Sequence, residues 1–141
     1  MTHVLVRERH AMLAGMTPTL KEGRYFFCTT GDTTIPAALA NRCLALFRED
    51  EGTALVLTEQ DAREYALDLS MPMSRIVLEV FSALDGVGLT AGVATALADQ
   101  GIPCNMVAAY YHDHMFVPEP MAHRAIEILT DLQRRSGSTE I

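Results

Sequence analysis

The sequence predicts an α+β fold of two ferredoxin-like βαββαβ units that lie side by side, with strand exchange as an option. The chain has 141 residues and is 49% hydrophobic, which is enough for one ordinary core or two small ones. Strand patterns of period two alternate with helical patterns in both halves. A boundary near residues 68–74 divides the chain, so we expect one unit over residues 1–70 and another over 71–141.

The first half has three predicted strands and two predicted helices. In chain order these are a helix over 4–16, a strand over 24–30, strands over 44–48 and 53–58, and a helix over 59–67. Pro18 ends the first helical pattern. Gly52 lies between the second and third strands, where it can adopt the positive φ that a tight hairpin needs.

The second half reads β-α-β-β-α. Its elements are a strand over 75–80, a helix over 89–97, strands over 102–111 and 114–117, and a helix that begins near Pro120. In the first of these strands, Arg75, Val77 and Glu79 alternate with apolar residues, so we expect its two faces to differ. Gly101 follows the helix at a position where helices often end in a left-handed residue.

Each predicted unit is one strand short of the six-element ferredoxin-like order. A missing strand leaves a sheet edge unpaired unless a strand is exchanged between the units or comes from a second chain. We therefore expect a homodimer.

Charge and cysteine content exclude several classes of partner. The net charge of -7 disfavours both nucleic acid and anionic membranes, and Lys21 is the only lysine. Cys28, Cys43 and Cys104 have no CxxC spacing, which favours a reducing compartment. No apolar run approaches the roughly 20 residues that span a bilayer. We expect a cytoplasmic protein with neither a nucleic-acid nor a membrane partner.

The candidate ligand site lies on one rim of the second unit. A right-handed crossover places the loop over residues 82–88 and the hairpin over 110–114 at the same end of the sheet. The helix that follows Gly86 and Gly88 offers unpaired N–H groups to a carboxylate, and Asp113 can meet an ammonium group. A free amino acid carries both groups. The predicted ligand-binding residues are Asp85, Gly86, Val87, Gly88, Leu89, Thr90, His112 and Asp113.

Structural interpretations of the same residues remain open. Gly86 and Gly88 can simply let the chain turn into a helix, and Asp113 can be a turn former that bonds to nearby backbone. Tyr110 and Tyr111 point to opposite faces of a strand, so we expect at least one of them to be packed.

The His112–Asp113–His114 turn raises the alternative of a metal-dependent enzyme, because imidazole and carboxylate groups bind zinc and related ions. A closed site needs about four ligands, and the sequence offers no second His/Cys cluster. Ser82 and Cys104 have no evident partner base. No GxSxG, P-loop or HExxH motif occurs. We expect no catalytic residue, no metal and no cofactor.

Two segments resemble a family of small bacterial proteins with tandem ACT domains: Val87-Gly-Leu-Thr-Ala91 and Tyr110-Tyr-His-Asp-His-Met-Phe-Val-Pro118. Further matching segments cover residues 16–18, 23–29, 47–52 and 101–105, so that the resemblance extends from about Leu5 to Leu132. More distantly, the segment from Asp113 to Pro118 is similar to one in the CASTOR arginine sensors and resembles the paired ACT units of aspartokinases.

This resemblance implies side-by-side βαββαβ units, a dimer or internal pseudo-dimer, and regulation by a small ligand. It also implies that Asp113 faces the basic end of the ligand while residues 86–90 close over it. The preferred hypothesis is a non-enzymatic, amino-acid-sensing regulatory module. Its main alternative is a structural module that dimerises or binds an enzyme or regulator without a ligand.

Overall fold

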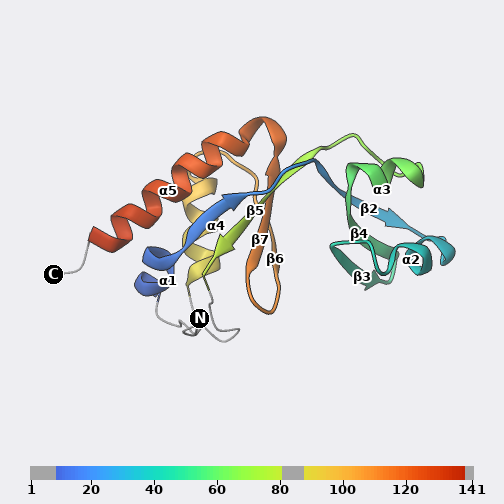
Figure 1. Ribbon diagram of the computed structural model, residues 1–141, viewed down its shortest axis with the longest axis horizontal. Coiled ribbons are helices and arrows are strands. Elements are labelled where there is room, and N and C mark those ends of the chain that lie inside the picture. Colours follow the sequence, from blue (N-terminus) through green and yellow to red (C-terminus); the bar gives the residue numbers. More distant parts are fainter. Residues whose placement is uncertain (1–8, 81–87, 139–141) are drawn as a thin grey trace. The chain divides into compact units, whose positions relative to one another are not determined.

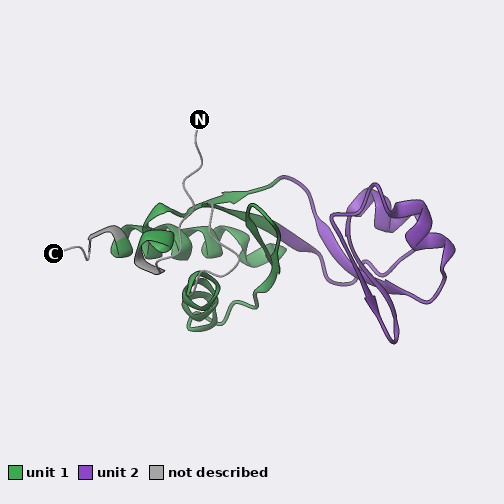
Figure 2. Ribbon diagram, turned by 90° about the horizontal axis from the view of Figure 1, so that it is seen from below, with its two compact units in different colours: residues 1–21, 75–141 green, residues 22–74 purple. Residues whose placement is uncertain are grey.

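The computed structural model describes residues 9–80 and 88–138 (Figure 1). The elements are α1 (Arg9–Gly15), β1 (Thr17–Leu20), β2 (Tyr25–Thr30), α2 (Thr34–Leu39), β3 (Ala45–Glu49), β4 (Gly52–Thr58), α3 (Glu59–Glu64), β5 (Met73–Glu79), α4 (Leu89–Ala98), β6 (Asn105–Ala108), β7 (Asp113–Pro118), a 3₁₀ turn (Glu119–Met121) and α5 (Ala122–Ser138). They form two compact units, coloured separately in Figure 2. Unit 1 combines residues of 1–21 and 75–141, and unit 2 consists of 22–74.

Unit 1 has a four-stranded sheet with α1, α4 and α5 packed against it. β1 pairs antiparallel with β5, β5 adjoins β7, and β7 pairs antiparallel with β6. One face of this sheet carries Ile76, Leu78, Met115 and Val117, which are buried in a single apolar cluster with residues of all three helices. The second face carries the alternate residues of β5 and β7.

The first half of the chain supplies the strand that unit 1 lacks in the sequence pattern. β1 pairs with β5 in a register that joins Thr17 to Glu79 and Leu20 to Ile76. Pro18 was expected only to end a helix, but it lies inside β1. Proline is tolerated on a strand at a sheet edge, where its missing N–H removes no hydrogen bond between strands. The strand exchange therefore occurs within one chain, and a second chain is not needed to complete unit 1.

Unit 2 contains β2, β3, β4, α2 and α3, with strand order β3-β4-β2. Its core is a second apolar cluster whose buried members are Phe26, Cys28, Leu39, Leu55, Leu57 and Ala62. The predicted hairpin is confirmed, with Gly52 at a φ of 155°. α2 was not predicted, because it is a six-residue helix that contains Pro36. Proline is compatible with a first helical turn.

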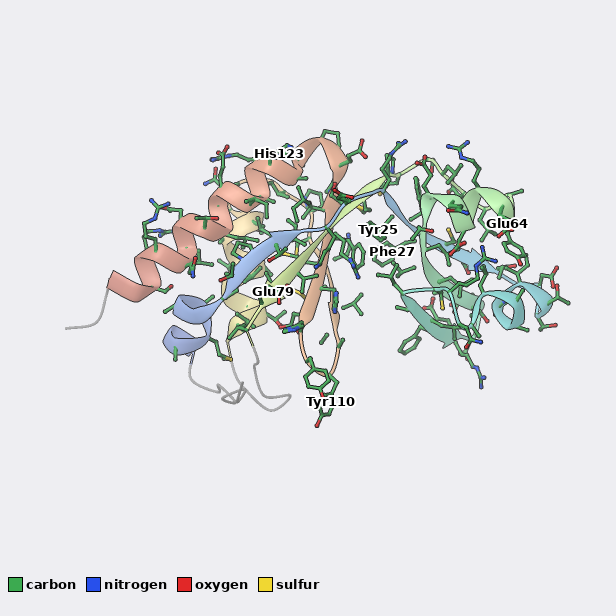
Figure 3. The ribbon with its side chains drawn as sticks, in the orientation of Figure 1. Tyr25, Phe27, Glu64, Glu79, Tyr110 and His123 are labelled. Carbon is green, nitrogen blue, oxygen red and sulfur yellow. The ribbon has the colours of Figure 1, made fainter. Side chains whose placement is uncertain are left out.

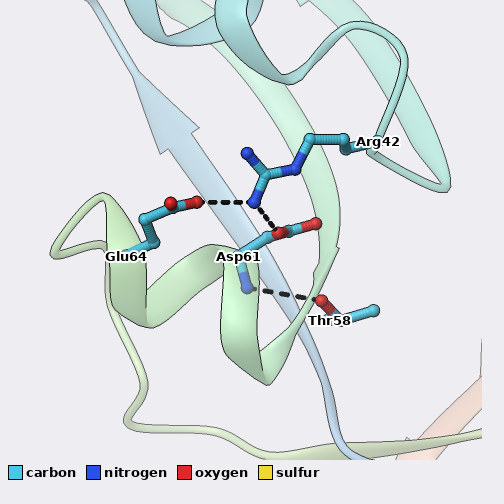
Figure 4. A network of polar contacts seen from close by, with 4 residues as sticks. All are labelled: Arg42, Thr58, Asp61 and Glu64. Atoms are coloured by element: carbon cyan, nitrogen blue, oxygen red, sulfur yellow. Dashed lines mark hydrogen bonds and ion pairs between the residues drawn. The ribbon is translucent and has the colours of Figure 1, made fainter.

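A polar network holds α3 against the segment that precedes β3 (Figure 4). Arg42 donates from Nη2 to Asp61 and, over 2.5 Å, to Oε2 of Glu64. These contacts, with Glu64 first, raise the pKa of Arg42 above its usual range. Thr58 caps α3, because its Oγ1 accepts the Asp61 N–H over 3.3 Å. The network belongs to unit 2, whereas the predicted ligand site belongs to unit 1.

The predicted α+β class is confirmed, and most strands lie within a few residues of their predicted positions. The strand predicted over 102–111 is shorter, because only Asn105–Ala108 pairs with β7 and the chain then turns. Within the described ranges, no helix has the length and apolar character needed to cross a membrane.

Candidate functional site

The end of β5 and the turn between β6 and β7 meet at one rim of unit 1. Nε2 of His112, just before β7, lies 3.7 Å from Oε2 of Glu79, the last residue of β5. Figure 3 shows Glu79 on β5 and Tyr110 at the end of the β6–β7 hairpin. We define the rim by Glu79 at the end of β5, residues 88–90 at the start of α4, and residues 109–113, which join β6 to β7.

Three of the predicted ligand-binding residues, Asp85, Gly86 and Val87, lie outside the described residues. Gly88 is the N-cap of α4 and has a φ of 106°, a left-handed conformation that suits glycine. Because glycine has no side chain, α4 has no side-chain cap there, and its first turn has no acidic residue. The first N–H groups of α4 therefore keep their capacity to bind an anion.

Leu89 and Thr90 have different environments at the start of α4. The Leu89 side chain is buried in the core of unit 1, so only its backbone N–H is suited to contact a polar ligand. Thr90 is exposed, and its hydroxyl lies in the first turn of the helix. The predicted contact of Leu89 with a ligand can therefore involve only its backbone.

Asp113 is a nearly buried acid at the first position of β7. Its residue surface is only 9% exposed, and it shares the core-facing side of β7 with Met115 and Val117. Burial raises the pKa of the Asp113 carboxyl, and the neighbouring His112 opposes this shift. A cation placed beside this carboxyl would offset the cost of burying its charged form.

His112 and His114 lie on the opposite face of the sheet from Asp113. His112 contacts Glu79, and the pKa of His114 responds to Glu79 and Arg75, which belong to the outward face of β5. The His-Asp-His turn therefore does not direct its three side chains to one point. In the described part of the chain, no group of three or more His, Cys, Asp or Glu side chains could hold a metal ion.

Tyr110 and Tyr111 are both exposed, with fractions of 67% and 60%. Their rings meet edge to face with centroids 5.0 Å apart. The expectation that one of them is packed is wrong, because the strand ends at Ala108 and both tyrosines lie in the turn. They give the rim an exposed aromatic surface.

The thiol pKa values of Cys28 and Cys104 are both raised. Burial raises the pKa of the Cys104 thiol, and burial followed by the charge of Asp68 raises that of Cys28. A raised pKa lowers the fraction of reactive thiolate.

The sequence hypothesis missed a group of charged residues on the outward face of unit 1. These residues lie around His114, because the charges of Arg75, His112, Glu79 and Lys21 all shift its pKa. The alternation of Arg75, Val77 and Glu79 along β5 was the signal for this face. It could not identify Lys21, because β1 was not predicted.

Comparisons with known proteins agree with the fold. Two family models, each described as an ACT domain, match residues 6–74 and 72–131. The two matches meet near residue 73. The compact units have different bounds, because the segment that contains β1 packs with the second half of the chain. No protein of curated function matches the chain at a significant level.

Several solved structures are similar. A protein of unknown function from Vibrio cholerae, described as a possible transport protein, is 41% identical with a TM-score of 0.76, over 88% of this chain and 94% of that one. A protein from Agrobacterium tumefaciens is 19% identical with a TM-score of 0.69, over 84% and 89% of the two chains. The ligand-free regulatory subunit of aspartate kinase from Thermus thermophilus is 12% identical with a TM-score of 0.64, over 82% and 95%. The last two show a shared fold.

Proposed function

The chain belongs to the ACT domain family and carries two such domains in tandem, and from this premise we propose that it is a non-enzymatic regulatory protein that binds an amino acid or a similar small polar ligand. The rim of unit 1 is the proposed site. The ligand's ammonium group lies beside Asp113, and its carboxylate lies at the N-terminus of α4.

The observation that carries this proposal is the state of the Asp113 carboxyl. Its residue surface is only 9% exposed, and burial raises the pKa of its carboxyl while the charge of His112 opposes that shift. A buried acid in that state is costly unless a cation compensates it. A ligand ammonium would supply the cation, and the uncapped start of α4 would supply the anion-binding half of the same site.

A thermal-shift screen against the common amino acids tests the proposal. A ligand that binds only the folded state raises the melting temperature, by an amount that corresponds to about 2.7 kcal/mol when its concentration is 100 times Kd. We expect at least one amino acid to produce such a shift. An equally large shift in a protein that carries Asp113→Asn would contradict the assignment of the site.

A partner-binding role is the second candidate, supported by the exposed apolar surface of unit 2. Phe27 on β2 and Phe47 on β3 are 44% and 72% exposed. Both lie on the sheet face away from the core, because Phe27 pairs with Val56 and Phe47 with Ala54. Exposed aromatic residues on a small sheet are typical of interaction surfaces.

This surface also supports the predicted homodimer, in which two copies of unit 2 cover each other. Sedimentation at micromolar concentration tests it. We expect a dimer in the unmodified protein and a shift towards monomer in a protein that carries Phe47→Asp. A monomer in both samples would overturn the dimer and leave a different protein as the occupant of the surface.

A further inference from the structure

Five titratable side chains share the outward face of the unit 1 sheet. Lys21 follows β1, Arg75 and Glu79 lie on β5, and His112 and His114 lie at the start of β7. All five are partly exposed. We call this surface, which lies on the side of the sheet away from α4 and α5, the polar face. The buried side chain of Val77 lies between Arg75 and Glu79 along β5.

Two positive charges are neighbours at one end of the polar face. The Lys21 N–H donates a 2.9 Å hydrogen bond to the Arg75 carbonyl, which extends the β1–β5 pairing beyond Leu20 and Ile76. An anion bound at this end would be attracted to both side chains, so this end of the face is suited to a negatively charged ligand.

The two histidines extend the positive end towards the rim. Nδ1 of His112 and Nδ1 of His114 are both buried, and neither has a hydrogen-bond partner within the described residues. Buried polar atoms without a partner are uncommon and need an explanation, such as a ligand. A neutral imidazole can donate one N–H to an anion and a protonated one can donate two. His114 lies between the lysine–arginine end and the Glu79–His112 pair, with Val107 opposite it on β6.

We propose that the polar face is a second small-molecule site, at which Lys21, Arg75 and His114 bind a carboxylate. A guanidinium group matches a carboxylate in a bidentate geometry. Phosphate sites usually employ helix N-termini and free backbone N–H groups, whereas the backbone N–H groups of a sheet face are directed along the sheet. The face therefore favours a carboxylate over a phosphate. Glu79 limits the site at the rim end, because its charge repels a second anion there.

Anion binding at this face is coupled to protonation of His114. Burial, followed by the charges of Arg75 and His112 and then that of Lys21, lowers the pKa of His114, while Glu79 opposes them. A carboxylate beside the ring favours the imidazolium form, so its binding raises this pKa. By linkage, the ligand binds more tightly as the pH falls from the pKa of His114 in the complex towards its lower pKa in the free protein.

The probe for this proposal is succinate, added to the full-length chain at low ionic strength. Lys21 is the only lysine, so reductive ¹³C-methylation gives a single lysine side-chain signal for NMR, and ring ¹⁵N shifts report on each histidine. We expect succinate to shift the Lys21 and His114 signals together, and to raise the pKa of His114. Lys21→Gln should weaken binding about 5- to 10-fold, within the range of one partly exposed charge-assisted contact.

Matched variants keep this test independent of folding. Lys21→Arg should restore most of the affinity, and Arg124→Gln, on the exposed surface of α5, should leave it unchanged. Arg75→Gln should weaken binding as Lys21→Gln does, with melting curves to verify that each variant folds. Absence of any shift at millimolar succinate would overturn the proposal, as would equal affinity in Lys21→Gln. Stronger shifts with inorganic phosphate than with succinate would overturn the carboxylate assignment. Because succinate has no ammonium group, these outcomes are separate from those of the rim site.

Discussion

Thr17 lies directly opposite Glu79 in the antiparallel pairing of β1 with β5. This pairing places a segment from the start of the chain in the sheet of unit 1, beside the candidate rim. α1 also packs in unit 1, where the Ala14 carbonyl accepts a 3.3 Å hydrogen bond from Nε2 of Gln133 on α5. The stability of unit 1 therefore depends on residues outside the half of the chain that carries its other elements.

Replacing Met12 by alanine tests this dependence. Met12 is 1% exposed in the unit 1 core, and the loss of a buried methionine side chain costs about 2–5 kcal/mol. Met71→Ala is the matched control, because Met71 is 63% exposed. Its expected effect is below about 0.5 kcal/mol. Urea unfolding of both variants provides the comparison, and equal midpoints would contradict the placement of α1 in this core.

A glycine series tests the β3–β4 hairpin. A Cβ at Gly52 would lie 2.8 Å from the Thr30 carbonyl oxygen, and the φ of 155° is unfavourable for other residues. We expect Gly52→Ala to lower the free energy of unfolding by roughly 1–3 kcal/mol. A Cβ at Gly31 meets no atom within 4 Å, so Gly31→Ala should be close to neutral. If thermal melts show equal losses, the hairpin geometry is wrong.

Thr58→Ala tests the cap of α3. Its hydroxyl accepts the Asp61 N–H over 3.3 Å, and the loss of such a cap costs about 1 kcal/mol. Thr58→Ser keeps the hydroxyl and should retain most of the stability. Chemical denaturation of the two variants measures the difference. A serine variant as unstable as the alanine variant would show that the methyl group, not the cap, matters.

The pH dependence of stability tests the environment of His114. Its pKa lies below the ordinary value of 6.5 in the folded protein, so the unfolded state binds more protons between the two values. Stability is therefore complete above pH 6.5 and falls as the pH falls through the lowered pKa. His114→Gln should reduce this acid-side loss and leave the slope between pH 7.5 and 8.5 unchanged. Identical pH profiles for the two proteins would contradict this environment.

The fold was largely predictable because both units have clear local patterns. The alternation along β5 and the helical spacing of α4 are each decided by residues that are neighbours in sequence. β1 was missed because it is a four-residue strand that contains Pro18 and is defined by its distant partner β5. α2 was missed because six residues with an internal proline give no helical periodicity.

The candidate site was only partly predictable, for the same physical reason. Asp113 and Gly88 follow from local turn and cap patterns, whereas the burial that raises the pKa of Asp113 depends on packing. The polar face depends on the β1–β5 pairing, which brings Lys21 beside Arg75. No local pattern indicates that pairing.

Calorimetric titration of an amino acid that passes the thermal-shift screen, into the unmodified protein and into Asp113→Asn, tests the proposed function most directly. A charge-assisted contact with the ligand's ammonium contributes about 1.5–3 kcal/mol, so the account predicts roughly 10- to 150-fold weaker binding in the variant. Because asparagine removes a costly buried charge, the variant's melting temperature at neutral pH should equal or exceed that of the unmodified protein. Unchanged affinity together with a lowered melting temperature would contradict the ligand role and identify Asp113 as a structural turn residue.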